Sequence, residues 1–344
     1  MTGEKKQMQV WKKPWLFAML LVIVLVVSGC GQNQGSVSKE PASQQSGSPT
    51  IGSQSEAITP ANESEVRTIK HEMGETKIQG NPTRIITLYQ GANDAAVAYG
   101  VKPVGIVESW LQKPVYEYLR DELDDVPQLG TEVQPNLEEI YKLKPDVIFA
   151  TKTRHEGIYD QLSQIAPTVM IGEVYDWKAS VNLMGEVLNR GDKSKELMAE
   201  WDSRVDDFKQ KMGDRLPIEA TITNFRADHA RIFYMGYAGG ILKELGFARP
   251  EGHDAEVWGV QLTSKESIPD MNADVIFNFN SGDDMAAVEK YYKDWTSHPL
   301  WANLDAVKNN QVYMVDEVSW NMAGGILSAH LMLDSLYDLF ELDK

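Results

Sequence analysis

The sequence predicts an α/β protein in which two lobes are joined by one long α-helix. Two observations carry this prediction. A phrase that begins with Glu and ends in Asp-Val-Ile-Phe occurs at Glu138–Phe149 and again at Glu266–Phe277, about 128 residues further along the chain. Between the two copies, residues 178–212 contain no proline and repeat apolar residues at helical spacing. We therefore expect two lobes of similar architecture with a helical connection between them.

The repeated phrase combines a short helix with a buried strand. In both copies the Glu is followed by Ile after two residues and by Leu or Met after five, which places the apolar side chains on one helix face. Asp-Val-Ile-Phe is a short apolar run of the kind that forms a buried strand. A helix that leads into a parallel strand is half of an α/β unit. Shared topology explains the repeat, and a chance likeness between two helix-to-strand junctions is the alternative.

Segments around the two copies continue the alternation of strands and helices. In the first lobe, residues 65–177, the predicted strands are Arg84–Tyr89, Val104–Val107, Asp146–Thr151 and Thr168–Gly172, and the predicted helices are Ala92–Tyr99 and His155–Ile165. In the second lobe, residues 214–344, the predicted strands are Ala220–Phe225, Arg231–Met235 and Gln311–Val315, and the predicted helices are Ala238–Leu245 and Ile326–Leu339. We expect two Rossmann-like lobes with a ligand cleft between them, at the carboxyl ends of the strands.

The linking helix is predicted over residues 178–213. Its apolar residues fall into two groups at helical spacing, Val181 to Leu188 and Leu197 to Phe208. A break is expected at Asn189–Asp192, where Asn-Arg-Gly-Asp interrupts the apolar pattern. Two lobes joined in this way would move little against each other.

The chain begins with a segment typical of an exported protein. A basic start is followed by the apolar run Phe17–Val27, by two small residues and by Cys30, the only cysteine. This order defines a secretory signal, here residues 1–29, and the run is short of the ~20 residues that span a bilayer. A cysteine at this point resembles the lipobox of bacterial lipoproteins, which implies that Cys30 is lipidated. An uncleaved membrane anchor and a chance free cysteine are the alternatives.

Residues 30–64 are rich in Ser, Gln, Gly and Pro and are predicted to form a disordered tether after the lipidated cysteine. A lipidated tether fits a protein held at the cell membrane with its folded body on the extracellular face, as in Gram-positive bacteria. The formal net charge of -17 argues against a nucleic-acid partner, but a local arginine cluster could still bind a small anion. Since the sequence has no nucleophile elbow, zinc-protease motif or phosphate loop, a secreted lipoprotein hydrolase is disfavoured.

Several phrases resemble the iron-siderophore substrate-binding lipoproteins of ABC importers. They include P-N-L-E-E-I with K-P-D-V-I-F in the first lobe and H-P-L-W-A-N-L-D-A-V-K-N-N-Q-V-Y in the second. The resemblance covers residues 67–342 and implies the class III fold, in which a long helix links the lobes. It also implies a monomeric binding protein, not an enzyme, without a cofactor. Such a protein carries an Fe(III)-siderophore to the permease subunits of the importer. The phrases T-L-Y-Q-G-A-N-D and N-F-R-A-D-H-A-R-I look closest to members that bind citrate-type carboxylate siderophores such as staphyloferrin B.

The resemblance further implies a permease-docking site. In the family, one Glu on each lobe is thought to meet arginines of the permease, and the matching positions are Glu138 and Glu266. The alternative is structural, because a Glu in the first turn of a helix is favoured by the helix dipole.

Candidate ligand-binding residues follow from the chemistry of the ligand. A ferric carboxylate complex is a compact polyanion, and arginine pairs carboxylates in a bidentate fork. Arg154 and Arg226 each stand at the end of a predicted strand, one in each lobe, and should face the cleft. Arg231, His155 and His229 are their neighbours in the sequence. Pairing with surface carboxylates, or capping and packing for the histidines, is the alternative. The iron needs no protein ligand, because the chelator fills its coordination sphere.

Aromatic and amide residues near other strand ends complete the candidate set. They are Tyr89, Gln90, Trp110, Tyr237, Trp320 and Asn321, with Trp258 as a further aromatic. Trp and Tyr combine apolar bulk with a hydrogen-bond donor, and core packing is the alternative role. The same fold could instead bind a hydroxamate siderophore, haem or cobalamin. A neutral or cationic hydroxamate complex would make Arg154 and Arg226 poor partners, so these two residues discriminate between the ligand classes.

Overall fold

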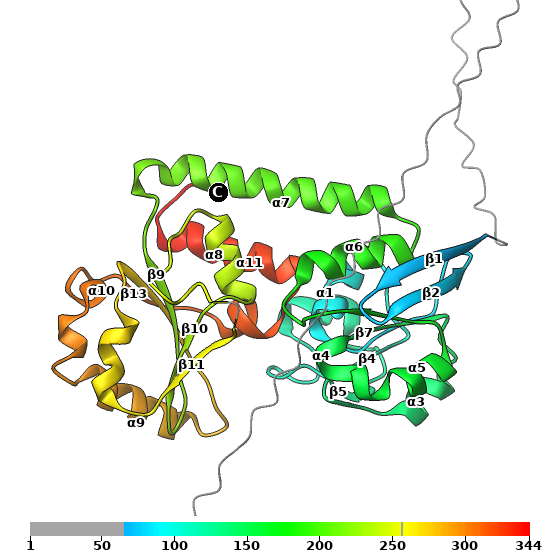
Figure 1. The fold of residues 1–344 in the computed structure, drawn as a ribbon, viewed down its shortest axis with the longest axis horizontal. Helices are drawn as coiled ribbons and strands as arrows, with labels where there is room; N and C mark the ends of the chain where they lie inside the picture. Colours follow the sequence, from blue (N-terminus) through cyan, green and yellow to red (C-terminus); the bar gives the residue numbers. More distant parts are fainter. Residues whose placement is uncertain (1–64, 256) are drawn as a thin grey trace, which may run out of the picture. The chain divides into compact units, whose positions relative to one another are not determined.

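The computed structural model describes residues 65–255 and 257–344 of the chain. The predicted signal peptide, Cys30 and the tether lie outside the described residues. Within the described part, no helix is both long enough and apolar enough to cross a bilayer. Two separate sheets, each accompanied by helices, form the body of the described chain (Figure 1).

The first sheet is four-stranded and parallel, in the order β4-β3-β7-β8. Its strands are β3 (Ile85–Thr87), β4 (Gly105–Ile106), β7 (Val147–Thr151) and β8 (Thr168–Ile171), so all four predicted strands are confirmed with shorter bounds. The helices of this lobe are α1 (Gln90–Ala98), α2 (Arg120–Leu123), α3 (Leu137–Lys142), α4 (Lys152–His155) and α5 (Tyr159–Ile165). The single helix predicted over 155–165 is wrong in its first part, because a 3₁₀ turn at Glu156–Ile158 separates α4 from α5.

Two antiparallel hairpins of the first lobe were not predicted. They are β1 (Val66–His71) with β2 (Gly74–Gln79), and β5 (Gly130–Thr131) with β6 (Gln134–Pro135). In the first hairpin each strand buries a single residue, Ile69 in β1 and Ile78 in β2. The alternation of apolar and polar residues that identifies a strand is therefore too weak to see in this part of the sequence.

The second sheet is five-stranded and mixed, in the order β11-β10-β9-β12-β13. Strands β9 (Ala220–Phe225), β12 (Val275–Asn280) and β13 (Val312–Met314) are parallel, whereas β10 (Ala230–Phe233) and β11 (Gly259–Leu262) add an antiparallel edge. The helices are α8 (Tyr237–Glu244), α9 (Met285–Thr296), α10 (Asp305–Lys308) and α11 (Ile326–Leu339). The sequence did not predict β11, α9 or α10, and the two lobes share only the parallel part of their sheets.

Both copies of the repeated phrase lead from a short helical segment into an interior strand of a sheet. In the first lobe α3 precedes β7, and in the second the 3₁₀ segment Lys265–Met271 precedes β12. The equivalent isoleucines, Ile140 and Ile268, are both buried. The ring of Pro269 crowds the backbone carbonyl four residues earlier, which disfavours an α-helix in the second copy. The common topology predicted from the repeat is confirmed.

The connection between the lobes consists of two helices, α6 (Trp177–Val187) and α7 (Gly191–Met212). The break falls where the sequence predicts it, and Asn189 adopts a left-handed conformation with φ of 56°. Asn tolerates this conformation, which commonly follows the end of a helix. One face of α7 is buried, and its residues are Ser194, Leu197, Trp201, Val205, Phe208 and Met212.

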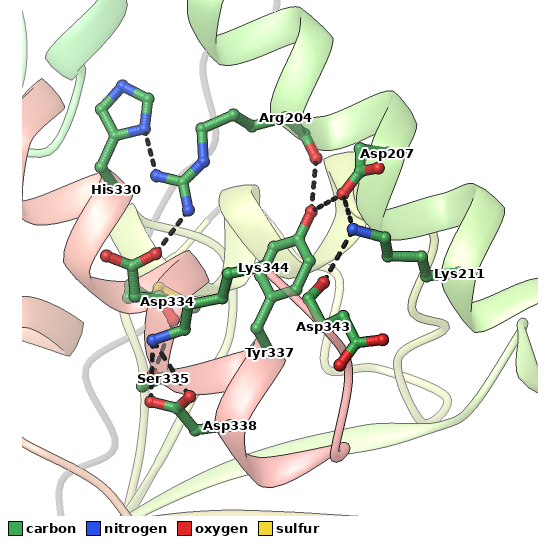
Figure 2. Close-up of polar contacts among 11 residues, drawn as sticks. Arg204, Asp207, Lys211, His330, Asp334, Ser335, Tyr337, Asp338, Asp343 and Lys344 are labelled. Carbon is green, nitrogen blue, oxygen red and sulfur yellow. Dashed lines mark hydrogen bonds and ion pairs between the residues drawn. The ribbon is translucent and has the colours of Figure 1, made fainter.

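A polar network fastens α7 to α11 (Figure 2). Arg204 donates a hydrogen bond of 2.8 Å to Nδ1 of His330 and pairs with Asp334. The hydroxyl of Tyr337 donates to the Asp207 carboxylate. Burial, followed by the nearby Arg204 charge, lowers the pKa of His330, so the ring stays neutral and can accept the hydrogen bond.

A buried carboxylate joins α1 to the start of α11. Asp94 accepts hydrogen bonds from the backbone N–H groups of Leu327 and Ser328, at 2.8 and 3.0 Å, and from the Tyr118 hydroxyl at 2.8 Å. Burial raises the pKa of Asp94 to about 6, while these hydrogen bonds oppose the shift. A Cβ atom at Gly325 would lie 2.1 Å from the Asp94 carboxyl carbon, so only glycine permits this close approach.

One hydrophobic core includes residues from both sheets. Phe149 of β7, Trp201 of α7, Ile222 of β9, Phe277 of β12 and Leu333 of α11 all belong to the same packed cluster. Since interiors of this kind are close-packed, the lobes are held together by shared packing and not only by the chain that connects them.

Candidate ligand-binding pocket

A pocket of about 540 Å³ lies between the two lobes, at the carboxyl ends of strands in both sheets. The first lobe contributes Gln90, Trp110, Glu132 and Arg154, the connecting segment contributes Glu173 and Tyr175, and the second lobe contributes Tyr237, Trp258, Phe279, Trp320 and Asn321, among others. This is the position at which open α/β sheets bind ligands. Seven of the residues that the sequence predicts line this pocket, namely Gln90, Trp110, Arg154, Tyr237, Trp320, Asn321 and the further aromatic Trp258.

A larger pocket of about 740 Å³ borders the first one at Glu173, Tyr175 and Tyr237. None of its lining residues is an arginine, and its acidic residues outnumber its lysines. The lining carboxylates are Glu72, Glu173, Asp176, Glu186 and Glu244, and the lysines are Lys70 and Lys178. The smaller pocket is lined by Arg154 beside Glu132 and Glu173, and Arg231 lies against its wall over Trp258. Because it is the pocket that arginines border, it is the candidate site for an anionic ligand.

Glu132 organises the wall that the first lobe contributes. Its side chain is only 4% exposed, and one carboxylate oxygen lies 3.4 Å from Nε of Arg154. The other oxygen accepts a hydrogen bond of 3.2 Å from the backbone N–H of Gln90. Burial raises the pKa of Glu132, while the hydrogen bonds from Gln90 and Trp110 and the Arg154 charge act in the opposite direction. Three predicted pocket residues thus meet at one glutamate that the sequence did not indicate.

His155 is fully buried and does not line the pocket, so its prediction as a ligand contact is corrected. Its Nδ1 accepts a hydrogen bond of 3.1 Å from the Thr151 backbone N–H. The proton must then reside on Nε2, which donates to the Glu132 carbonyl oxygen at 2.8 Å. Burial lowers the pKa of His155, in keeping with a neutral ring. The residue holds the backbone of Glu132 in place behind the wall.

Tyr89 is also buried away from the pocket, so this prediction is corrected as well. Its hydroxyl donates a hydrogen bond of 3.1 Å to Ser180 of α6, and burial raises the pKa of the phenol. Tyr237 lines the pocket, but its hydroxyl donates to the Gly325 carbonyl oxygen at 2.7 Å and is not available to a ligand. Its ring, and not its hydroxyl, faces the site.

Arg226, Arg231 and His229 form a cluster on the second lobe, next to the pocket wall and not in it. Arg231 lies over the ring of Trp258, 5.8 Å from its centre, and Trp258 lines the pocket. Nε of Arg231 donates to Nε2 of His229 at 2.9 Å, so His229 is occupied by its neighbour. Arg226 lies 3.6 Å from Glu317, a second buried glutamate that the sequence did not indicate.

The aromatic residues of the pocket differ in exposure. Trp258 is 51% exposed and Trp110 is 38% exposed, so both present an accessible ring surface. Trp320 is almost fully buried, and its indole N–H donates to Ser335 at 3.1 Å. Trp320 therefore forms the floor of the pocket, whereas Trp110 and Trp258 stand at its mouth.

The predicted docking residues Glu138 and Glu266 occupy equivalent places at the starts of the two repeated helical segments. The side chain of Asn136 caps the first segment by accepting from Glu138 N at 3.1 Å, and that of Ser264 caps the second by accepting from Glu266 N at 3.3 Å. Both glutamates are exposed, and Glu138 also pairs with Lys142 at 2.9 Å. Within residues 65–255 and 257–344, no group of three or more His, Cys, Asp or Glu side chains is arranged to hold a metal ion.

A chain with two linked α/β lobes and a polar pocket between them has the architecture of a substrate-binding protein. This chain belongs to the periplasmic binding protein family, whose model matches residues 85–318. The predicted family resemblance and the class III fold are thereby confirmed, and the chain is a binding protein, not an enzyme.

Two known relatives and one solved structure are similar over most of the chain. The probable siderophore-binding lipoprotein YfiY of Bacillus subtilis (strain 168) is 39% identical over 332 residues, which are 94% of this chain and 96% of YfiY. The achromobactin-binding periplasmic protein of Dickeya dadantii (strain 3937) is 42% identical over 261 residues, which are 74% of this chain and 85% of that protein. The crystal structure of Staphylococcus aureus SirA complexed with staphyloferrin B is 49% identical and has a TM-score of 0.77. It covers 80% of this chain and 99% of SirA.

Proposed function

We propose that the protein is a lipid-anchored receptor on the extracellular face of the cell membrane that binds a ferric siderophore of the citrate-based carboxylate type. The observation that carries the ligand class is the placement of arginines in both lobes around one pocket. Arg154 lies in the wall with 37% of its side chain exposed, and on the opposite lobe Arg231 lies over Trp258 with Arg226 near it. A compact polyanion could pair with guanidinium groups from both sides.

The relatives support this proposal. SirA was solved with staphyloferrin B, and two further relatives carry names that refer to siderophore or achromobactin binding. The exposed rings of Trp110 and Trp258 would cover the apolar parts of such a ligand, and the arginines would pair its free carboxylates. The iron is the cargo of the ligand and would need no side chain of the protein to hold it.

Delivery to an ABC importer completes the proposed role. Glu138 and Glu266 would meet arginines of the two permease subunits, because both are exposed and occupy equivalent positions on the two lobes. A lipid on Cys30 would keep the receptor beside its permease, with residues 30–64 as tether. We propose that the receptor acts as a monomer.

The test is a titration of the purified chain from residue 31 onward, followed by quenching of tryptophan fluorescence. The probes are ferric staphyloferrin B, ferric citrate and a ferric trihydroxamate. Saturable binding of a carboxylate complex, with little binding of the trihydroxamate, is expected. Binding of the trihydroxamate alone would refute the carboxylate class and keep a siderophore receptor, whereas binding of none of the probes would refute the proposed function.

A further inference from the structure

Two glutamates stand behind the pocket arginines, one in each lobe, and both are almost fully buried. The side chain of Glu132 is 4% exposed and lies 3.4 Å from Arg154. The side chain of Glu317 is 8% exposed and lies 3.6 Å from Arg226. The two come from unrelated elements, since Glu132 lies between β5 and β6 and Glu317 directly precedes the π-helical turn Val318–Met322. Each lobe therefore has its own pair of an arginine and a buried glutamate, formed by different elements.

The ion pairs are looser than a structural salt bridge would be. The distances from arginine nitrogen to glutamate oxygen, 3.4 Å for Arg154 and 3.6 Å for Arg226, both exceed the roughly 2.7–2.9 Å of a charge-assisted hydrogen bond. Among the described residues, Oε1 of Glu317 accepts no hydrogen bond at all. Arg226 instead donates through Nε to Asn224 at 3.2 Å. The guanidinium groups are thus held near a negative charge while most of their N–H groups remain available.

The hydrogen bond from Gln90 to Glu132 does not itself require a negative charge. Glu132 accepts the Gln90 N–H, and a glutamine at this position could accept it equally well. Burying a carboxylate is unfavourable, and burial raises the pKa of both Glu132 and Glu317. A receptor for anions would also bind more tightly without these charges. Their presence therefore calls for a role in which charge itself matters.

We propose that Glu132 and Glu317 are counter-ions that set how much positive charge each half of the pocket presents, an inference that rests on the proposed function. They would thereby select the net charge of the ferric complex that binds. Glu132 offsets Arg154. Glu317 lies 3.6 Å from Arg226, and its charge also acts on Arg231, so one glutamate faces two arginines and the second lobe keeps an excess cation. Asp228 and Asp316 are also near this cluster, but they are exposed and screened by solvent. The more anionic end of the ligand then faces the second lobe.

The experiment measures affinities of Glu132→Gln, Glu317→Gln and Glu132→Ala for the three ferric probes at low and high sodium chloride. Each glutamine variant should bind ferric staphyloferrin B about three- to tenfold more tightly at low salt, and this gain should shrink at high salt. Affinity for the neutral or cationic trihydroxamate should not rise. Glu132→Ala should bind the carboxylate complex more weakly than wild type, because it leaves the Gln90 N–H without its acceptor.

Glu156→Gln is the matched control, because Glu156 is an exposed carboxylate close to Arg154 in the sequence. It removes the same charge from the protein and should leave all affinities unchanged. Weaker binding by both glutamine variants would mean that the glutamates only support the structure, and would overturn this inference while the proposed function stands. A wild-type protein that binds none of the probes would overturn both.

Discussion

In the first lobe a single arginine, Arg154, lies in the pocket wall and meets one buried glutamate. In the second lobe Glu317 lies 3.6 Å from Arg226 and its charge also acts on Arg231, beside the pocket wall. The supporting histidines differ in the same way. His155 is buried and bonded to backbone atoms, while His229 bonds to the side chains of Arg231 and Asp228. The first lobe thus offers a rigid wall of low net charge, and the second a cationic cluster held by side chains. We expect the second lobe to dominate the binding of polyanions.

Removing both arginines of the second lobe is the largest change we consider. Arg226→Ala combined with Arg231→Ala should weaken binding of ferric staphyloferrin B about a hundredfold or more, because each charge-assisted bond contributes roughly 1.5–3 kcal/mol. Fluorescence titration measures the loss. Lys290→Ala, an exposed cation on the same lobe, serves as the control and should have no effect. A loss smaller than that of Arg154→Ala would contradict the proposed dominance of this lobe.

The two histidines provide a test of rigidity. His155→Ala removes two hydrogen bonds to buried backbone groups and should lower the free energy of unfolding by about 2 kcal/mol. His229→Ala removes contacts to side chains only and should change this free energy much less. Thermal unfolding followed by circular dichroism compares the variants. Equal destabilisation by both would remove the distinction that we draw between the lobes.

Arg154 tests the less charged wall. Arg154→Ala should weaken binding of the carboxylate complex about tenfold, near the lower end of the range for one charge-assisted bond. Arg154→Lys should restore only part of the affinity, because an ammonium group cannot form the planar fork of a guanidinium. Full recovery of affinity in Arg154→Lys, in the same titration, would show that only the positive charge at this position matters and not the planar shape of the guanidinium group.

The smallest expected effect is the dependence of stability on pH through His155. Burial lowers its pKa in the folded state, so below the ordinary value of 6.5 the unfolded chain takes up a proton that the folded chain resists. The stabilisation is complete above pH 6.5 and is lost as the pH falls through that value towards the folded-state pKa. The difference in unfolding free energy between wild type and His155→Ala should shrink as the pH falls from 7.5 to 5. A constant difference in urea titrations would contradict this assignment.

The parts of the fold that the sequence predicted are those with strong periodicity. The repeat around Glu138 and Glu266, the apolar groups of α6 and α7, and the closing helix Ile326–Leu339 all follow their patterns. The hairpin of β1 and β2 buries one residue per strand, and β11 is a short edge strand, so neither has a readable pattern. Helix α9 is not among the predicted helices, although Asp284 is a recognisable cap whose side chain accepts a hydrogen bond of 3.0 Å from Ala287 N.

The residues of the candidate site could be predicted from the sequence only where they directly follow a predicted strand. Gln90 and Arg154 lie in the pocket wall as expected, but their immediate neighbours Tyr89 and His155 point into the interior. Adjacent residues at a strand end can face opposite sides, and the sequence does not say which. Glu132 lies in a hairpin too short for any periodicity, so its contact with Arg154 depends on tertiary structure alone.

The packed cluster that contains Phe149, Trp201, Ile222 and Phe277 has a consequence for how the protein loses its structure. Neither sheet can separate from the other without exposing a part of this cluster to water. Melting should then be a single cooperative transition, with calorimetric and van't Hoff enthalpies in agreement, and not the sum of two independent events. A mutation that destabilises one lobe would therefore lower the stability of the other lobe as well.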